Sequence, residues 1–289
     1  SPDGTLLRVE ISGDRAVVRA GRARFSLATL PAAEFPRMET ADAAADMEIP
    51  AGGLKRLLQG TQFAMAQQDV RYYLNGLLLE MNGSRLRAVA TDGHRMAVGE
   101  MRVGGATWEA RRVIAPRKSI IEMLRVLGEQ VEADAHARLF VGADHIGVAC
   151  GRVTFRSKLI EGSFPDYERV IPRGYERKAD VAREALGAAL GRAAILSNEK
   201  LRSVRLEFEA GRLSVRASNA ESEEAEEELE AQYLGDRLEV GFNIGYLQEA
   251  IGALAGTRVR LELQDSASSI LLTDPDEAGF QYVIMPMRL

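Results

Sequence analysis

The sequence contains a long internal repeat. The stretch GRARFSLATLPAAEFP, which starts at Gly21, matches GRVTFRSKLIEGSFP, which starts at Gly151. A second pair, LLLEMNGSRLRAVATDGHR from Leu77 and VRLEFEAGRLSVRASNAES from Val204, lies at nearly the same offset. Self-similarity at a fixed spacing indicates one structural unit used several times, here with a period of about 128 residues. The fold must therefore be built from copies of one module.

The repeat divides the chain of 289 residues into three parts. Residues 1–46 match only the end of a unit and are predicted to be the C-terminal remnant of a first domain with a linker. Residues 47–170 and 171–289 are predicted to be complete second and third domains. Because the first copy has no counterpart of the front of the unit, we expect the sequence to be truncated.

Each complete unit has the same order of predicted elements. A helical pattern opens it, hairpin-like alternation follows, and a second helix precedes the last strands. In the second domain, Asn82-Gly83 is the tight-turn signal, Pro116 is expected in the first turn of the second helix, and Gly128 is expected at its end. The helices are predicted over 51–66, 115–128, 181–196 and 243–256. The fold class is therefore α+β, with two helices packed on antiparallel sheet in each repeated domain.

Composition excludes several classes of protein. Hydrophobic residues make up 46% and charged residues 27%, as in soluble globular proteins. No apolar run approaches the roughly 18 residues that a membrane-spanning helix needs, and the N-terminus does not resemble a secretory signal. A single cysteine, Cys150, can form no internal disulfide, which favours a cytoplasmic protein. Three histidines and one cysteine leave little material for a metal site, so neither a metal nor a cofactor is expected.

The stretch VATDGHRMAV places Asp92, Gly93, His94 and Arg95 in succession. The equivalent place in the third domain reads SNAES, so the fold itself does not require the histidine and the arginine. A role specific to the second domain is indicated, against the simpler interpretation of a solvated turn after a strand. The alternative is a hydrolase that uses Asp92 and His94. Such an enzyme also needs a nucleophile, and the sequence has no G-x-S-x-G elbow, P-loop or G-x-G-x-x-G motif.

Five stretches resemble one protein family: RYYLNGLLLE, ATDGHRMAV, SFPDYERVIP, ILSNEKLRSVRL and the terminal YVIMPMRL. They are similar to the beta subunit of bacterial DNA polymerase III, the sliding clamp, and the resemblance spans all 289 residues. It implies DNA-clamp domains, three similar ones per subunit, arranged as a ring around duplex DNA. It also implies a non-catalytic processivity factor that tethers polymerases and repair proteins to the template.

The resemblance further implies a groove between the second and third domains that accepts a short peptide from each partner. The implied partners are the DNA polymerase III alpha subunit, the clamp loader and other replication and repair proteins. Gly93 fits such a site because a residue without Cβ lets a ligand backbone approach closely, and methionines supply adaptable apolar walls. The residues implied in the groove are Leu74, Thr91, Gly93, His94, Arg95, Met96, Pro165, Arg169, Val170, Leu201, Asn243, Tyr246, Ser269, Val283, Ile284, Met285, Pro286, Met287, Arg288 and Leu289.

A DNA-facing surface is the second implied site. Its contacts would go to phosphate, so they would attract duplex DNA without reading its sequence. At a net charge of −5 the chain cannot coat DNA with its whole surface, and the acidic run Glu221–Glu230 is expected to be a solvated outer strand or loop. The implied residues are Gln68, Arg71, Tyr72 and Tyr73 in one loop, with Lys55, Arg56, Arg117, Lys118 and Arg125 on the helices.

Assembly is implied by the same resemblance. A full-length subunit is expected to pair head to tail with a second copy into a homodimeric ring. This chain carries only the end of a first domain, so we expect it to be mostly monomeric. No association with a membrane is expected.

Overall fold

The computed structural model describes residues 6–35, 45–128, 135–197 and 202–288. The chain divides into two compact units, Ser1–Asp42 and Ala43–Leu289. The first unit is small, and the second contains both complete copies of the repeat. The predicted division of the second unit into separate domains at residue 170 stays a prediction.

The first unit is a three-stranded antiparallel meander formed by β1 (Leu7–Ser12), β2 (Arg15–Ala20) and β3 (Ala23–Ala28), followed by the short 3-10 helix η1 (Ala32–Glu34). The turn between β2 and β3 joins Ala20 to Ala23, as the turn between β10 and β11 joins Cys150 to Val153. This meander is therefore the counterpart of the strands that end the later repeats.

The second unit runs through the same elements twice. The first pass consists of β4 (Ala45–Pro50), α1 (Ala51–Gln62), η2 (Tyr72–Leu74), β5 (Gly76–Gly83), β6 (Arg85–Thr91), β7 (Arg95–Arg102), β8 (Trp108–Pro116), α2 (Arg117–Gly128), β9 (His136–Val141), β10 (His145–Cys150) and β11 (Val153–Lys158). After η3 (Tyr167–Arg169), the second pass consists of β12 (Arg177–Ala182), α3 (Arg183–Ala193), β13 (Ser203–Glu209), β14 (Arg212–Ser218), β15 (Glu224–Gln232), β16 (Leu238–Asn243), α4 (Ile244–Ala253), β17 (Arg258–Leu263), β18 (Ile270–Thr273) and β19 (Phe280–Ile284).

The described strands of the second unit form two sheets. One has four strands in the order β11-β10-β9-β4, and the other has twelve in the order β16-β13-β14-β15-β12-β17-β18-β19-β7-β6-β5-β8. The strand pairs within them are antiparallel, including β19 with β7, which joins the last strand of the second pass to the first pass. The two repeats therefore share one continuous sheet.

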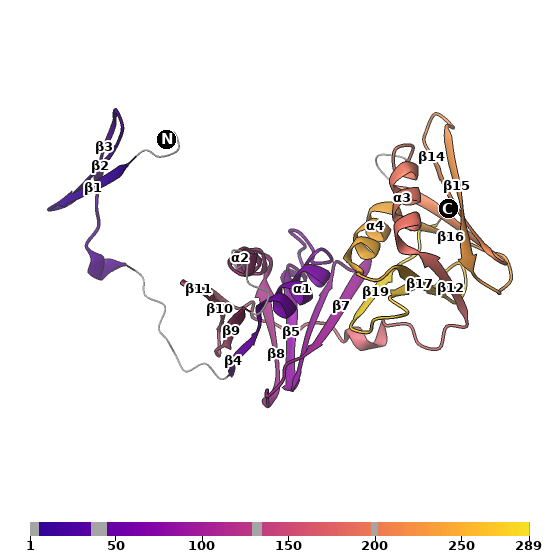
Figure 1. Ribbon diagram of the computed structural model, residues 1–289, viewed down its shortest axis with the longest axis horizontal. Coiled ribbons are helices and arrows are strands. Elements are labelled where there is room, and N and C mark those ends of the chain that lie inside the picture. The colour runs from indigo at the N-terminus through magenta and orange to yellow at the C-terminus, as the bar shows by residue number, and fades with distance from the viewer. Residues whose placement is uncertain (1–5, 36–44, 129–134, 198–201, 289) are drawn as a thin grey trace. The chain divides into compact units, whose positions relative to one another are not determined.

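Two helices pack on the sheets of each repeat. Figure 1 shows α1 beside α2 and α3 beside α4. In α1 the residues Leu54, Leu57 and Leu58 are at most 1% exposed, and this spacing places them on one face of the helix. In α2 the residues Ile120 and Met123 are fully buried in the same way. The predicted α+β class, with two helices on antiparallel sheet in each complete repeat, is confirmed.

Several local predictions were wrong in detail, and α3 and α4 are shorter at both ends than the predicted 181–196 and 243–256. Asn82 pairs with Arg85 across the hairpin, so the turn residues are Gly83 and Ser84, and the φ of +57° falls on Gly83, where the absence of Cβ makes it easy to adopt. Pro116 ends β8 instead of lying inside α2. The first helix stops at Gln62, four residues early, and Phe63, which follows it, places its ring 5.6 Å from that of Tyr282 in β19.

Candidate functional site

The junction between the repeats is a strand pair that continues into the C-terminal tail, residues 285–288. In the pairing of β19 with β7, Val283 lies opposite Met96 and Ile284 opposite the first residue of β7. The amide of Met285 then donates to the carbonyl oxygen of His94 at 2.9 Å, and that of Met287 donates to the carbonyl oxygen of Gly241 at 2.8 Å. The tail is thus held by main-chain hydrogen bonds to β16 as well as to the turn before β7.

The turn that enters β7 is ordered by its own side chains. Gly93 has a φ of +90°, which favours glycine. The hydroxyl of Thr91 donates to the carbonyl oxygen of Arg95 at 2.6 Å and accepts from the amide of Gly93 at 3.1 Å. Asp92 accepts from the amides of His94 at 2.9 Å and Arg95 at 3.0 Å. These bonds fix the main chain of the whole DGHR motif.

The same contacts disfavour the hydrolase interpretation. One carboxylate oxygen of Asp92 binds two main-chain amides, and the other binds Nε of Arg95 at 3.0 Å. His94 is exposed, and its contact with Asp92 is through its amide rather than its ring. A catalytic histidine needs an acid that orients its imidazole, and Asp92 is already engaged elsewhere.

Arg95 connects the two repeats. Its side chain is only 10% exposed, and besides Asp92 it binds the carbonyl oxygen of Phe63 at 2.6 Å and the carboxylate of Glu249 on α4. Its guanidinium carbon also lies 4.3 Å from the centre of the Tyr246 ring, within cation–π range. The arginine was predicted to line the groove, but its donors are used to hold the repeats together.

Tyr246 is fixed by the start of α4. Asn243 caps this helix, and its side-chain oxygen accepts from the amide of Tyr246 at 3.2 Å. Burial raises the pKa of the Tyr246 hydroxyl, so the phenol stays neutral at ordinary pH. The ring therefore offers a partly apolar surface next to Arg95.

The predicted groove residues differ widely in exposure. Gly93, His94, Pro165, Arg169, Val170, Met285 and Arg288 are exposed, and Thr91, Arg95, Asn243, Tyr246, Ser269, Pro286 and Met287 are half-buried. Leu74, Met96, Val283 and Ile284 are buried, at 4% exposure or less, so they lie beneath the surface. Leu201 and Leu289 lie outside the described residues. The junction brings the DGHR turn and the tail into direct contact.

Sequence reasoning missed two groups of residues at the junction. Phe63 and Glu249 hold Arg95, and nothing in their local sequence marks them as its partners. Tyr167 is 2% exposed and lies in the connection between the repeats, inside the stretch SFPDYERVIP. The same stretch also contains Phe164, Val170 and Ile171, so no local signal singles out Tyr167.

The loop that precedes η2 adjoins the turn. Arg71 donates to Asp69, with Nη2 2.8 Å from Oδ2, and this bond together with the amide of Arg71 lowers the pKa of Asp69 to about 2. The guanidinium lies against Gly93, whose Cβ, if present, would be 3.1 Å from Nη2. Tyr72 and Tyr73 form an edge-on pair with ring centres 5.8 Å apart. Gln68 has a φ of +56°, an unusual value for a residue other than glycine.

The basic residues predicted to face DNA have different surroundings. Arg56 forms an ion pair with Glu277 at 2.8 Å, and Arg117 donates to the carbonyl oxygen of Met65 at 3.3 Å. Arg125 binds Glu122 at 2.8 Å. Lys118 is exposed and Lys55 is half-buried. These side chains all belong to α1 and α2, the two helices packed side by side.

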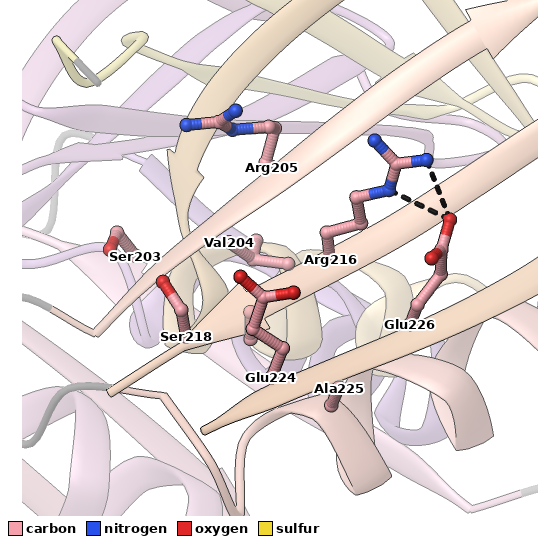
Figure 2. A pocket seen from close by; sticks show the side chains of 9 residues that line it. Ser203, Val204, Arg205, Arg216, Ser218, Glu224, Ala225 and Glu226 are labelled. Atoms are coloured by element: carbon pink, nitrogen blue, oxygen red, sulfur yellow. Dashed lines mark hydrogen bonds and ion pairs between the residues drawn. The ribbon is translucent and has the colours of Figure 1, made fainter. Parts of the chain in front are cut away.

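Residues 224–230 of the acidic run, predicted as a solvated outer strand or loop over Glu221–Glu230, lie in β15, and their side chains are alternately exposed and half-buried. A hollow of about 440 Å³ lies on this sheet at the start of β15. Figure 2 shows Arg216 reaching Glu226 beside this hollow, and the closest distance between the two groups is 2.6 Å. Its other lining side chains include Ser203, Ser218 and Glu224. A hollow with such polar walls does not suit the apolar anchors expected of the partner peptide.

No group of three or more His, Cys, Asp and Glu side chains in the described ranges could hold a metal ion. No helix in the part of the chain that the structure describes is long and apolar enough to cross a membrane.

Family models match both complete repeats. The model of the DNA polymerase III beta subunit, central domain, matches residues 48–166, and that of its C-terminal domain matches residues 168–288. The beta sliding clamp of Pseudomonas aeruginosa is 46% identical over 288 residues, which cover 100% of this chain and 78% of that protein. The beta sliding clamp of Escherichia coli is 45% identical with the same coverage.

Solved structures of sliding clamps also match this chain. The DNA polymerase sliding clamp from Pseudomonas aeruginosa superposes with a TM-score of 0.91 at 46% identity, over 100% of this chain and 78% of that one. The same clamp bound to griselimycin gives the same values. The beta sliding clamp of C. crescentus gives 0.92 at 39% identity, over 100% and 77%. Repeated α+β modules with this topology define a DNA clamp. The chain belongs to the family of the DNA polymerase III beta subunit, the beta sliding clamps.

Proposed function

We propose that this chain is a non-catalytic DNA sliding clamp that tethers replication and repair proteins through a peptide groove at the junction between its repeats. The observation that carries the proposal is the contact between the DGHR turn and the C-terminal tail, where exposed Met285 lies beside exposed His94. The relative from Pseudomonas aeruginosa that binds griselimycin, at 46% identity, supports a ligand site on this fold.

The chemistry of the groove suits a short peptide with apolar side chains. Met285 and Met287 are flexible and adapt to different partners, and Val170 adds an apolar contact. Two or three anchors contribute roughly 1.5 to 3 kcal/mol each on burial, before the cost of ordering the peptide. The affinity should therefore be near micromolar, or about −8 kcal/mol.

Calorimetric titration of a synthetic peptide that contains Gln, Leu and Phe tests the proposal. Wild-type protein should bind it, and a variant that lacks residues 285–289 should bind it much more weakly. Equal affinity in both proteins would place the partner site elsewhere. The variant His94→Ala should also bind more weakly, and in a screen for turnover neither protein should catalyse hydrolysis.

Duplex DNA is the second proposed partner. The side chains of Lys118 and Arg125 on α2, with Arg71 in the neighbouring loop, supply scattered positive charge on a chain whose net charge is −5. Binding to linear duplex should be weak, independent of sequence and lost as salt rises, because it depends on the release of counterions from phosphate. A tight preference for one sequence that resists salt would contradict sliding.

We also propose how two copies meet. The outer side of β15 is unpaired from Glu224 to Glu230 among the described residues, and β15 occupies the place in its repeat that β7 occupies in the other. β3 in turn is the counterpart of β19. If β3 of a second copy pairs with β15 as β19 pairs with β7, then Arg24 lies opposite Glu226. Opposite charges on facing residues stabilise such a pair of strands.

A further inference from the structure

The connecting segment, defined as residues 159–176, carries one side of the proposed groove. Pro165, Arg169 and Val170 all lie in it and all are exposed. An exposed connection has few contacts to hold it, whereas a wall of a binding site has to stay in place. Something must therefore fasten this segment to the sheet.

Tyr167 is the only buried residue between Glu161 and Val170, at 2% exposure. Its amide donates to the carbonyl oxygen of Pro165 at 2.8 Å, and its own carbonyl oxygen accepts from the amide of Val170 at 3.0 Å. These bonds link Tyr167 to the main chain of Pro165 and Val170. The half-buried Phe164 and Ile171 pack against the same buried side chains as the ring of Tyr167. The position of the ring therefore helps to set the positions of Pro165 and Val170.

The ring packs into the floor of the groove. It belongs to a small cluster of buried side chains that is separate from the main core, and the cluster contains Leu78, Val89, Met96, Val98, Ile114, Leu271 and Val283. Met96 and Val283 are the residues that face each other in the junction between β7 and β19. The wall and the floor of the groove therefore meet at the ring of Tyr167.

The hydroxyl of Tyr167 is held by charged groups on the sheet. It donates to the carboxylate of Glu80 on β5 and accepts from Nη1 of Arg87 on β6 at 2.9 Å. Arg87 also binds Glu100 at 2.9 Å and Glu168 of the connecting segment at 3.1 Å. The side chains of Glu80 and Arg87 are only 15% and 17% exposed, so these bonds are little screened by water.

Burial, reinforced by the bond to Glu80, raises the pKa of Tyr167 to about 12. The hydroxyl therefore keeps its proton at any physiological pH and remains a donor. Burial opposes the charge of Arg87, but its bonds to Tyr167 and Glu100 outweigh this effect and hold its pKa above the usual value. The phenol and the guanidinium thus keep the protonation states that these hydrogen bonds require.

We propose that Tyr167 is a positioning residue that fastens the connecting segment to the sheet and so sets the place of Pro165 and Val170 for an apolar side chain of the partner peptide. The choice of peptide as the ligand rests on the proposed function. Tyr167 does not touch the ligand. Its hydroxyl decides how firmly the wall is held, and thereby how well the groove distinguishes a large apolar anchor from a small one.

The variant Tyr167→Phe tests this, because it keeps the ring and removes only the hydroxyl. The matched control is Tyr175→Phe, which removes a hydroxyl from the same segment at a half-buried position. Amide hydrogen exchange gives the first measurement. Exchange of the Val170 and Tyr167 amides should become faster in Tyr167→Phe, while the amides of Met285 and Met287 in the junction should exchange as in wild type.

Peptide affinity gives the second measurement. The peptide containing Gln, Leu and Phe should bind Tyr167→Phe about tenfold more weakly, which is the effect of losing one hydrogen bond to a charged group. The same peptide with its Phe replaced by Ala should bind wild type and variant equally. A loss of affinity that is the same for both peptides would indicate general damage to the fold and overturn the positioning role.

Other outcomes also decide between the two proposals. Unchanged exchange at Val170 in Tyr167→Phe overturns the inference, as does faster exchange with unchanged peptide affinity. If the wild-type protein fails to bind the peptide at all, the proposed peptide groove is wrong, and the positioning of a wall for that peptide is wrong with it. The exchange measurement then still shows separately whether the hydroxyl fastens the segment.

Discussion

The amide of Met287 donates to the carbonyl oxygen of Gly241 at 2.8 Å, as the amide of Ile160 donates to that of Ile114 one repeat earlier, also at 2.8 Å. The C-terminal tail is thus the counterpart of the start of the connecting segment. Each repeat ends with a short bridge back to one of its own strands, β8 or β16, and these are the two edge strands of the twelve-stranded sheet. In the second copy this bridge places the tail next to the candidate groove.

Truncation of Met287 should weaken partner binding with little effect on the fold. The side chain is half-buried, and its bond to Gly241 uses only the main chain, which alanine keeps. Loss of its apolar contact should lower affinity for the Gln-, Leu- and Phe-containing peptide by about tenfold. Calorimetry measures this, with thermal unfolding as the check on the fold. Wild-type affinity in Met287→Ala would remove the residue from the site.

Arg95→Ala should destabilise the contact between the repeats. It leaves Asp92 without its guanidinium partner and removes the contacts to Phe63, Tyr246 and Glu249. Removal of one member of a largely buried charge pair should cost about 2 to 4 kcal/mol of unfolding free energy. Denaturant unfolding measures this, with exposed Arg173→Ala as the control. Equal losses of unfolding free energy in the two variants would mean that Arg95 does not hold the repeats together.

The proposed contact between copies is open to a double-mutant cycle. Arg24→Gln and Glu226→Gln should each weaken self-association about fivefold, because each removes a cross-strand charge pair. The double variant should be no weaker than either single one, since the second change has nothing left to remove. Sedimentation velocity over a range of concentrations measures all four proteins. Strictly additive effects would show that the two side chains do not meet.

The carboxyl of Asp69 should titrate at about pH 2 because its hydrogen bonds with Arg71 hold its pKa below the usual 3.8. The folded value is lower than the unfolded one, so this contact contributes to stability above about pH 3.8 and is lost as the pH falls through 2. Carboxyl NMR shifts can follow the titration directly. In Arg71→Gln the midpoint should rise toward 3.8. A midpoint that does not move would separate Arg71 from the titration.

The repeat and its elements could be predicted from the sequence because they depend on local periodicity. The apolar spacing of α1 and the glycine at the turn after Asn82 are examples, although the turn itself was misplaced by one residue. The contacts across the junction could not be predicted in this way. Arg95 and Glu249 are separated by 154 residues, and no pattern near either one names the other. Tyr167 was missed for the same reason, since its partners Glu80 and Arg87 come from distant strands.

The candidate groove also has features that could be predicted from the sequence and features that could not. The presence of a special turn at Asp92–Arg95 followed from its difference from the other repeat. The roles of the individual residues in this turn could not be predicted from the sequence, because the direction of a side chain depends on its packed neighbours. His94 is exposed at the surface of the turn. The side chain of Arg95, in contrast, is only 10% exposed and is bound on several sides.

The pairing of β19 with β7 joins two unlike strand edges, and the described chain carries further edges of both kinds. β3 and β11 are counterparts of β19 and end their sheets, and β15 is the counterpart of β7 with most of its outer side unpaired. A contact between unlike edges adds each new copy in the same direction. Such an assembly closes into a ring only when the rotations from copy to copy add up to a full turn. The bend at each strand pair therefore decides whether such copies form a closed particle of fixed size or a filament without end.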